Sequence, residues 1–257
     1  MFRARHQELG TIRALKVRQG TSEAGARRFE REIEHLARVR HPNVIAIHEG
    51  GVEGGAAYFA MDLIEGQPLN ELIEAGPLPW RRAIDLCLGL CRGVGALHEI
   101  GLIHRDLKPA NVMVSAAGEP VLIDFGLAID PHSDERLTRT GALVGTVVYM
   151  APEQVSGAEP DPRSDVYALG LILHELLTGS PALDPDDSTP VLIRRILSGV
   201  HPRPSSDVPD LPARLDRIVR RACAKERAER YPDAGALGAD LAAARDAPGL
   251  SAARLRL

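Results

Sequence analysis

The sequence predicts an α+β protein of two lobes, a small antiparallel-sheet lobe with one main helix followed by a larger helical lobe. Three observations support this fold class. Strand-like alternation of apolar and polar residues is concentrated before residue 62, and apolar residues at helical spacing dominate from residue 80 onward. The chain has 257 residues, 44% hydrophobic and 26% charged, which is enough for a sizeable core. We expect a sheet lobe over 1–65, a helical lobe over 66–245 and a tail over 246–257, with a ligand between the lobes.

The sheet lobe is expected to contain a strand over residues 11–17 and then a helix between about 23 and 40, ended by the proline that follows. Alternation along the strand places Ala14 and Lys16 on one face. The helix carries an inward stripe of apolar residues, namely Phe29, Ile33 and Leu36. Glu32 lies on the same stripe, so its carboxylate should face a cation inside the protein.

Two more strands and most of the helices follow. Residues 44–48 and 56–61 alternate like strands, and the glycine-rich segment 50–55 predicts a hairpin connection between them. Trp80–Ile100 has apolar residues at helical spacing, and Val166–Leu177 is apolar on nearly all sides, which predicts a buried central helix. Short strands are expected at 112–114 and 121–123, and further helices near 190–198, 213–223 and 234–245.

Composition and charge argue against several classes of protein. The net charge of −4 argues against a nucleic-acid partner, and no apolar run approaches the roughly 18 residues of a membrane span. Without an apolar leader, the chain is expected to be cytoplasmic. Three cysteines are too few for a disulfide framework.

The basic residues are unevenly divided between arginine and lysine. Of 31 basic residues 28 are arginine, so the three lysines, Lys16, Lys108 and Lys225, mark positions where a compact charge is favoured.

The most specific stretch of the sequence is His104-Arg105-Asp106-Leu107-Lys108-Pro109-Ala110-Asn111. It is followed by Asp124-Phe125-Gly126 and then by Ala151-Pro152-Glu153. In order and spacing, these motifs resemble the catalytic loop, the metal-binding loop and the end of the activation segment of protein kinases. The chain is therefore similar to the eukaryotic-like, Hanks-type Ser/Thr protein kinases of bacteria, from residue 1 to about residue 245. The resemblance implies a bilobal protein-kinase-like fold and transfer of the ATP γ-phosphoryl group to Ser/Thr hydroxyls of a protein substrate.

Phosphoryl transfer requires hard oxygen ligands for Mg²⁺, a cation near the phosphates and a carboxylate at the attacking hydroxyl. The resemblance implies that Asp106 orients the hydroxyl and accepts its proton, and that Asn111 and Asp124 bind Mg²⁺. Lys108 would neutralise the phosphoryl group during transfer. Taken alone, these residues leave open a polar loop in which Asp and Asn merely form turns.

The ATP nucleotide is expected beneath the strand that carries Lys16. Adenine would pack on the small side chain of Ala14, and the Lys16 ammonium would bind the phosphates. Glu32 is the natural partner of this lysine, because an inward carboxylate is costly without a cation. Spacing alone leaves open a surface lysine and a semi-exposed glutamate.

Residues 58–66 resemble the hinge between kinase lobes, with Met61 gating the pocket behind adenine. The backbone of Asp62 and Ile64 would then hydrogen-bond the adenine edge, and Met113 would pack beneath the ring. Taken alone, the two methionines are ordinary core residues.

The segment from 124 to 153 resembles an activation segment. Thr138 and Thr140 match positions that carry regulatory phosphates in the family, and Arg105 would bind such a phosphate. Thr146 matches the threonine that contacts the catalytic Asp and Lys in Ser/Thr-specific members. The resemblance therefore favours Ser/Thr over Tyr as the acceptor.

Three further residues match scaffold positions of the family. Glu153 and Arg230 correspond to its buried structural salt bridge. Asp165 corresponds to the residue of the central helix that anchors the catalytic loop. These residues are expected to hold the motifs in place rather than to contact ATP.

One family element has no counterpart, namely the G-x-G-x-x-G loop with its preceding strand. Gly10, Gly20 and Gly25 do not have the required spacing, and the glycines at 50–55 occur too late in the chain. We therefore expect that Met1 is not the natural start, or that the chain is truncated with impaired catalysis. In either case the sheet should have an unpaired edge where the first strand belongs.

Two other functions compete with the kinase. The missing loop would suit a non-catalytic kinase-like binding or scaffold module, whereas intact Asp106, Asn111 and Asp124 argue for an enzyme. A small-molecule phosphotransferase of related fold is the third hypothesis. The Ala-Pro-Glu motif and the Thr146 segment favour protein substrates over small molecules.

Overall fold

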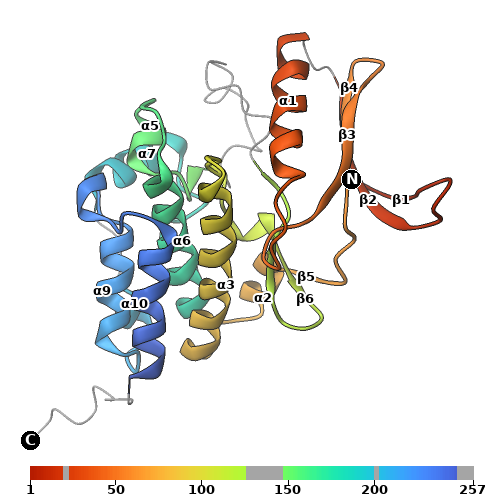
Figure 1. The fold of residues 1–257 in the computed structure, drawn as a ribbon. Helices are drawn as coiled ribbons and strands as arrows, with labels where there is room; N and C mark the ends of the chain where they lie inside the picture. Colours follow the sequence, from red (N-terminus) through yellow and green to blue (C-terminus); the bar gives the residue numbers. More distant parts are fainter. Residues whose placement is uncertain (20–22, 126–146, 200–202, 248–257) are drawn as a thin grey trace, which may run out of the picture.

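A four-stranded antiparallel sheet with one helix packed on it forms one lobe, and a larger group of helices forms the other (Figure 1). The computed structural model describes residues 1–19, 23–125, 147–199 and 203–247. The strands are β1 (Phe2–Arg5), β2 (Ile12–Arg18), β3 (Ile47–Glu53) and β4 (Ala56–Met61). Their order is β1-β2-β4-β3, so β1 lies at an edge and pairs only with β2 in the described sheet. The predicted α+β fold class is confirmed.

The hairpin between β3 and β4 is tighter than the sequence predicts. Its turn is confined to Gly54 and Gly55, whose φ values are +57° and +80°. Gly50 belongs to the strand, where a Cβ atom would lie only 2.9 Å from Cγ2 of Ile33 in the helix above. Glycine at this position lets the helix approach the sheet, so the glycine-rich segment is not a single connection.

The segment before β3 joins the two lobes instead of forming a strand. The strand predicted over 44–48 is present only in part, because Val44 makes only isolated bridge contacts and β3 begins at Ile47. The N–H of Ile45 donates to the carbonyl of Leu122 at 2.9 Å. The N–H of Leu122 in turn donates to the carbonyl of Asn43 at 3.0 Å. The backbone groups of this segment are thus used to hold the second lobe.

Helix α1 (Glu23–Leu36) covers one face of the four-stranded sheet (Figure 1). The apolar stripe predicted for it is buried, and the Phe29 ring lies 6.1 Å from that of Phe59 in β4. The helix ends at Leu36 rather than near residue 40. The N–H groups of Arg38 and Val39 bond carbonyls three residues back, which tightens the chain into turns.

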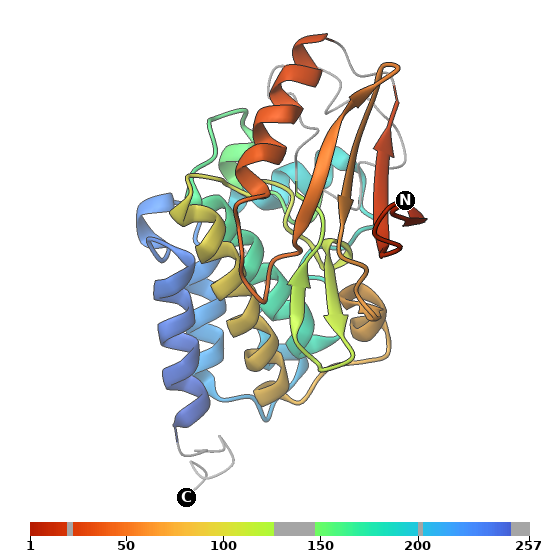
Figure 2. The same ribbon diagram turned by 45° about the vertical axis from the view of Figure 1, so that its right-hand side comes forward.

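The helical lobe contains the long helices expected from the sequence and several short elements. The long helices are α3 (Trp80–Glu99), α6 (Pro162–Thr178), α7 (Thr189–Ser198), α9 (Ala213–Ala222) and α10 (Ala234–Asp246). The short helices are α2 (Leu69–Glu74), α5 (Pro152–Val155) and α8 (Pro204–Asp207). A small sheet lies beneath the larger one in Figure 2 and consists of β5 (Gly66–Pro68), β6 (Val112–Ser115) and β7 (Pro120–Leu122). Within the described ranges, no helix is long and apolar enough to cross a membrane.

Helix α6 is the buried centre of this lobe, as predicted, and packs against α3, α9 and α10. The Asp161 carboxylate caps its first turn by accepting the N–H of Arg163 at 2.8 Å. Gly170 lets α9 approach, because a Cβ atom there would lie 2.7 Å from Cβ of Ala222. A helix enclosed in this way gives the loops above it a rigid base.

Candidate active site

The loop between α3 and β6 holds three of the predicted residues together. Nζ of Lys108 lies 3.0 Å from Oδ2 of Asp106. Asn111 ends a short 3₁₀ turn, and its Nδ2 donates to the Asp106 carbonyl at 2.7 Å and to Oδ2 at 3.2 Å. The side chains of Asp106 and Lys108 are each 20% exposed, so the pair is shielded yet reachable from solvent. A carboxylate fixed in this way is suited to receive a proton from a bound hydroxyl.

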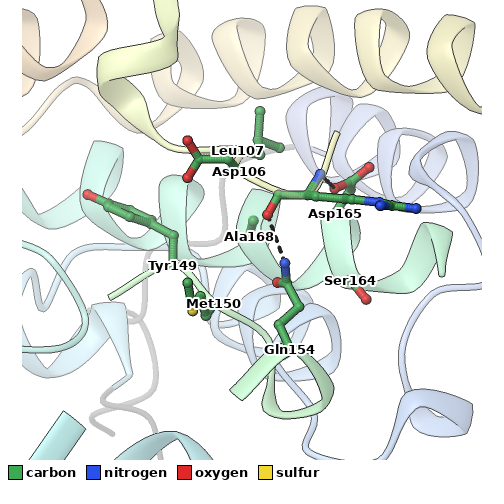
Figure 3. A pocket seen from close by; sticks show the side chains of 9 residues that line it. Asp106, Leu107, Tyr149, Met150, Gln154, Ser164, Asp165 and Ala168 are labelled. Atoms are coloured by element: carbon green, nitrogen blue, oxygen red, sulfur yellow. Dashed lines mark hydrogen bonds between the residues drawn. The ribbon is translucent and has the colours of Figure 1, made fainter. Parts of the chain in front are cut away.

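The backbone of Arg105 adopts an unusual conformation directly before Asp106, and this conformation sets the direction of the chain at Asp106. Its φ is +66°, in the left-handed region that residues other than glycine rarely adopt. The Asp165 carboxylate on α6 accepts the N–H groups of His104 at 2.9 Å and Arg105 at 3.0 Å. From the other side, Nε2 of Gln154 donates to the Arg105 carbonyl at 2.7 Å. Figure 3 shows both side chains beside the loop, and Asp165 has the anchoring role predicted for it.

Two histidines complete the support beneath the loop. Nε2 of His98 lies 2.8 Å from Oδ2 of Asp165, so the buried carboxylate has three hydrogen-bonding partners that offset its desolvation. His104 is buried, and its ring centroid lies 5.8 Å from that of Phe125. Burial lowers the pKa of His104, so its ring is neutral and acts by packing.

Lys16 of β2 pairs with Asp124 and not with Glu32. Its Nζ lies 2.5 Å from each carboxylate oxygen of Asp124. Glu32 instead lines a small cavity with Phe125 and the end of α3. The predicted Lys16–Glu32 ion pair is therefore wrong in this structure. The sequence identifies the face of α1 that carries Glu32, but the distance from that face to β2 depends on how helix, sheet and second lobe pack together.

Asn111 and Asp124 fit the hard-oxygen site expected for Mg²⁺. The amide nitrogen of Asn111 donates to Asp106, which leaves its amide oxygen available to a metal ion. The Asp124 side chain is 30% exposed, and a metal ion would share with Lys16 the two carboxylate oxygens that Nζ contacts at 2.5 Å. Carboxylate and amide oxygens are ligands that Mg²⁺ prefers, and the residues present therefore suit this ion.

Ala14, Met61 and Met113 come from three different strands around the position predicted for adenine. Ala14 pairs with Met61 across β2 and β4, and both side chains are buried. Cross-strand partners share one face of a sheet, so this pair forms a small apolar surface. Met113 is half-buried in β6, in the second sheet.

The segment after β4 is held by hydrogen bonds that the sequence does not predict. The N–H of Asp62 donates to the Ala46 carbonyl at 3.1 Å. Oδ1 of Asp62 accepts Nη1 of Arg13 at 2.9 Å and lies 2.7 Å from Nε2 of His48. Among the described residues, the N–H of Ile64 has no partner. That N–H and the Asp62 carbonyl are a donor and an acceptor of the kind that an adenine edge can bond.

The predicted salt bridge between Glu153 and Arg230 is present and buried. Nη1 and Nη2 of Arg230 bond the two Glu153 oxygens at 2.8 and 2.9 Å, and the arginine side chain has no exposed surface. The guanidinium also donates to three backbone carbonyls. Burial opposes ionisation of Glu153, but the bonds from Arg230 and Ser164 outweigh it and lower the pKa of this carboxyl. The bridge ties α5 to the segment before α10.

Thr138, Thr140 and Thr146 lie outside the described residues. Arg105, the predicted partner of a phosphate on Thr138 or Thr140, has its backbone fixed by Asp165 and Gln154. The roles of the three threonines therefore stay predictions.

Four residues of this region were missed by the sequence reasoning. Gln154 directly follows the Ala-Pro-Glu motif, and a polar side chain at that position was an available signal. His98 lies in the last turn of α3, next to the catalytic loop in sequence. No local signal marks Arg13 or His48, because they meet Asp62 only when β2 and β3 pair on either side of β4.

Comparison with known proteins agrees with this geometry. Residues 1–232 match the family model described as protein kinase domain. The chain belongs to the protein kinase family. It is 37% identical, over 90% of its length, to Serine/threonine-protein kinase PknL of Mycobacterium bovis. It is 36% identical, over 83% of its length, to Serine/threonine-protein kinase PknB of Mycobacterium leprae. The kinase chain spans 58% and 35% of the lengths of these two relatives.

Solved structures show the same kinase fold. The crystal structure of the Mycobacterium tuberculosis PknI kinase domain matches 93% of this chain and 88% of its own, with a TM-score of 0.73 and 29% sequence identity. A mutant form of the same domain matches 95% of this chain and 89% of its own, with a TM-score of 0.74 and 28% identity. The predicted bilobal kinase fold is thereby confirmed.

Proposed function

We propose that this protein is a Ser/Thr protein kinase that transfers the γ-phosphoryl group of Mg-ATP to hydroxyls of a protein substrate. The proposal is carried by the contact of Lys16 with Asp124, next to the loop that joins Asp106, Lys108 and Asn111. This arrangement supplies a cation, metal-binding oxygens and a candidate base from separate segments of the chain. The names of the bacterial relatives support Ser/Thr specificity.

The proposed reaction needs no covalent intermediate on the protein. The substrate oxygen forms a bond to the γ-phosphorus while the bond from that phosphorus to the bridging oxygen breaks, and ADP leaves. Asp106 accepts the hydroxyl proton as the new bond forms, and Lys108, 3.0 Å away, donates to the phosphoryl oxygens. Lys16 neutralises the ATP phosphates. Mg²⁺ held by Asn111 and Asp124 would offset the remaining negative charge of those phosphates.

We further propose that adenine packs against Ala14, Met61 and Met113, with Asp62 and Ile64 bonding its edge through their backbones. The donor on Ile64 and the buried Ala14–Met61 pair support this placement. We also propose that residues 1–65 and 66–245 form the two lobes, so that adenine would lie between them.

We also propose that the kinase is regulated by phosphorylation. Phosphate on Thr138 or Thr140 would pair with Arg105, and Thr146 would contact the catalytic Asp and Lys.

We propose that the protein works in the cytoplasm. Its three cysteines are all free thiols, as is typical of proteins in a reducing compartment.

The experiment that tests the proposal measures which acceptor takes the phosphoryl group. With γ-labelled ATP and Mg²⁺, we expect label on Ser and Thr of a protein acceptor, and none on a tyrosine polymer or an aminoglycoside. Phosphoamino-acid analysis identifies the product, and a sample with the metal chelated is the control. Label on the aminoglycoside would instead favour a small-molecule phosphotransferase. Mg-ATP binding without transfer to any acceptor would favour a non-catalytic module.

A further inference from the structure

An open groove of about 610 Å³ lies on the helical lobe, and none of the residues assigned to phosphoryl transfer lines it. It is bounded by the end of α7, the residue before α8, the last turn of α9 and the segment that follows α9. Helix α9 lies on the side of the helical lobe away from the four-stranded sheet (Figures 1 and 2). The groove is therefore a surface separate from the proposed active site.

Positive side chains outnumber negative ones in this groove. The charged residues are Arg203, Arg220, Arg221, Lys225, Asp216 and Glu229. Ser205 already bonds the Asp216 carboxylate through its N–H and its hydroxyl. The Arg221 guanidinium stacks 4.2 Å from the centre of the Tyr231 ring. Across the described part of the chain, Arg203, Arg220 and Lys225 take part in no ion pair, so their charges can serve a partner.

Stabilisation of α9 does not account for this set of cations. Arg220 and Arg221 lie in the last turn of α9, where positive charge favours the helix dipole. Arg203 comes from a different segment and converges on the same groove. Lys225 is one of only three lysines, and the other two belong to the proposed active site. A Cβ atom on Gly199 would lie 2.8 Å from Cβ of Lys225, so the base of this exposed side chain is packed in place.

The floor of the groove gives a second criterion for the partner. It is lined by the half-buried Ala224 above the buried Val219 and Cys223, so the surface beneath the cations is apolar. A peptide segment with alternating acidic and apolar side chains matches both properties. A nucleic acid would use the cations alone and would meet Asp216, Glu229 and the net charge of −4 of the chain.

We propose that this groove docks an acidic segment of the protein substrate. The carboxylates of that segment pair with Arg203, Arg220 and Lys225, and its apolar side chains contact the floor. The inference rests on the proposed kinase function, since the docked partner is the molecule to be phosphorylated. Because the groove is separate from the catalytic loop, the docking segment and the acceptor hydroxyl belong to different parts of the substrate.

Binding is tested first, without ATP, by fluorescence anisotropy of a labelled peptide in which Glu alternates with Leu. At low salt, the double variant Arg220→Glu/Lys225→Glu should bind this peptide about tenfold more weakly than the wild type, because two attractive charges become repulsive. The matched control Arg194→Glu/Arg217→Glu makes the same charge change on exposed positions of α7 and α9 outside the groove, and it should bind like the wild type. An equal loss in the control would overturn the proposal. So would equal binding of a Gln-Leu peptide or of single-stranded DNA of the same charge.

Kinetics then separate docking from catalysis. A short Ser/Thr acceptor peptide should be phosphorylated equally by the wild type and by Arg220→Glu/Lys225→Glu. Joining the acidic segment to this acceptor should lower KM for the wild type about tenfold, leave kcat unchanged and have no effect in the variant. Equal KM for the two substrates with the wild type would contradict docking. If neither substrate is phosphorylated, the kinase proposal fails, and the binding measurement still decides whether the groove accepts an acidic segment.

Discussion

Asp106→Asn is expected to lower kcat for protein phosphorylation by about 10²–10⁴, because an amide cannot take the proton of the attacking hydroxyl. The substitution keeps the shape of the side chain and its position beside Lys108. Affinity for Mg-ATP should stay near that of the wild type, since the proposed metal ligands Asn111 and Asp124 are unchanged. Steady-state kinetics measure kcat, and titration calorimetry measures the Kd of Mg-ATP.

Asp186→Asn is the matched control for this substitution. Asp186 is an exposed aspartate between α6 and α7, so the same chemical change there should leave kcat and Kd unchanged. If Asp106→Asn has the same kcat as this control, Asp106 is not the proton acceptor. A joint loss of turnover and Mg-ATP affinity would assign it to nucleotide binding instead.

Arg230→Met is expected to lower the free energy of unfolding by about 3–5 kcal/mol, because it leaves the buried Glu153 carboxylate with only the more distant and partly exposed Arg227, whose Nε lies 3.6 Å away. Three backbone carbonyls that accept from the guanidinium would also lose their donor. Urea unfolding monitored by circular dichroism measures the change. A loss below about 1 kcal/mol, the range of a surface ion pair, would show that the bridge is not structurally important.

Two further variants isolate the contribution of the buried charge. Arg245→Met removes the arginine from an exposed ion pair with Asp85, and it should cost no more than about 1 kcal/mol. The double variant Glu153→Gln/Arg230→Met should be more stable than Arg230→Met alone, because no uncompensated charge is left in the interior. If the double variant loses as much as Arg230→Met, packing of the arginine rather than its charge holds this region.

The pH dependence of the same bridge has a defined sign. In the folded protein the pKa of Glu153 is below its ordinary value of 4.5, so the carboxyl contributes stability that is fully present above that value. This contribution is lost as pH falls through the lowered pKa. The difference in unfolding free energy between the wild type and Arg230→Met should therefore shrink at acidic pH.

Much of the site could be predicted because its residues lie close together in sequence. Asp106, Lys108 and Asn111 fall within one loop. A motif of that length predicts both the backbone conformation of the loop and the positions of its side chains. The Glu153–Arg230 bridge was also predictable, but only through the family resemblance, since 77 positions separate the two residues. The buried character of α6 followed from its nearly continuous apolar sequence.

The features that could not be predicted depend on how separate elements pack. Periodicity places Glu32 on the inner face of α1, but it does not state how far that face lies from Lys16. Asp62 receives Arg13 and His48 because β4 lies between β2 and β3, an order that differs from the order in the chain. Gly50 has the composition of a turn yet lies within a strand, because its missing side chain is needed for contact with α1.

The most direct test of the central claim is the rate of γ-phosphoryl transfer by Lys16→Met, measured beside its urea unfolding curve. The Lys16–Asp124 contact is partly exposed, with side-chain exposures of 35% and 30%, so the variant should stay folded. If Lys16 neutralises the ATP phosphates, transfer to a Ser/Thr acceptor should fall by at least about 10²-fold while the unfolding midpoint changes little. Transfer at the wild-type rate by folded Lys16→Met would contradict the assignment of this site to phosphoryl transfer.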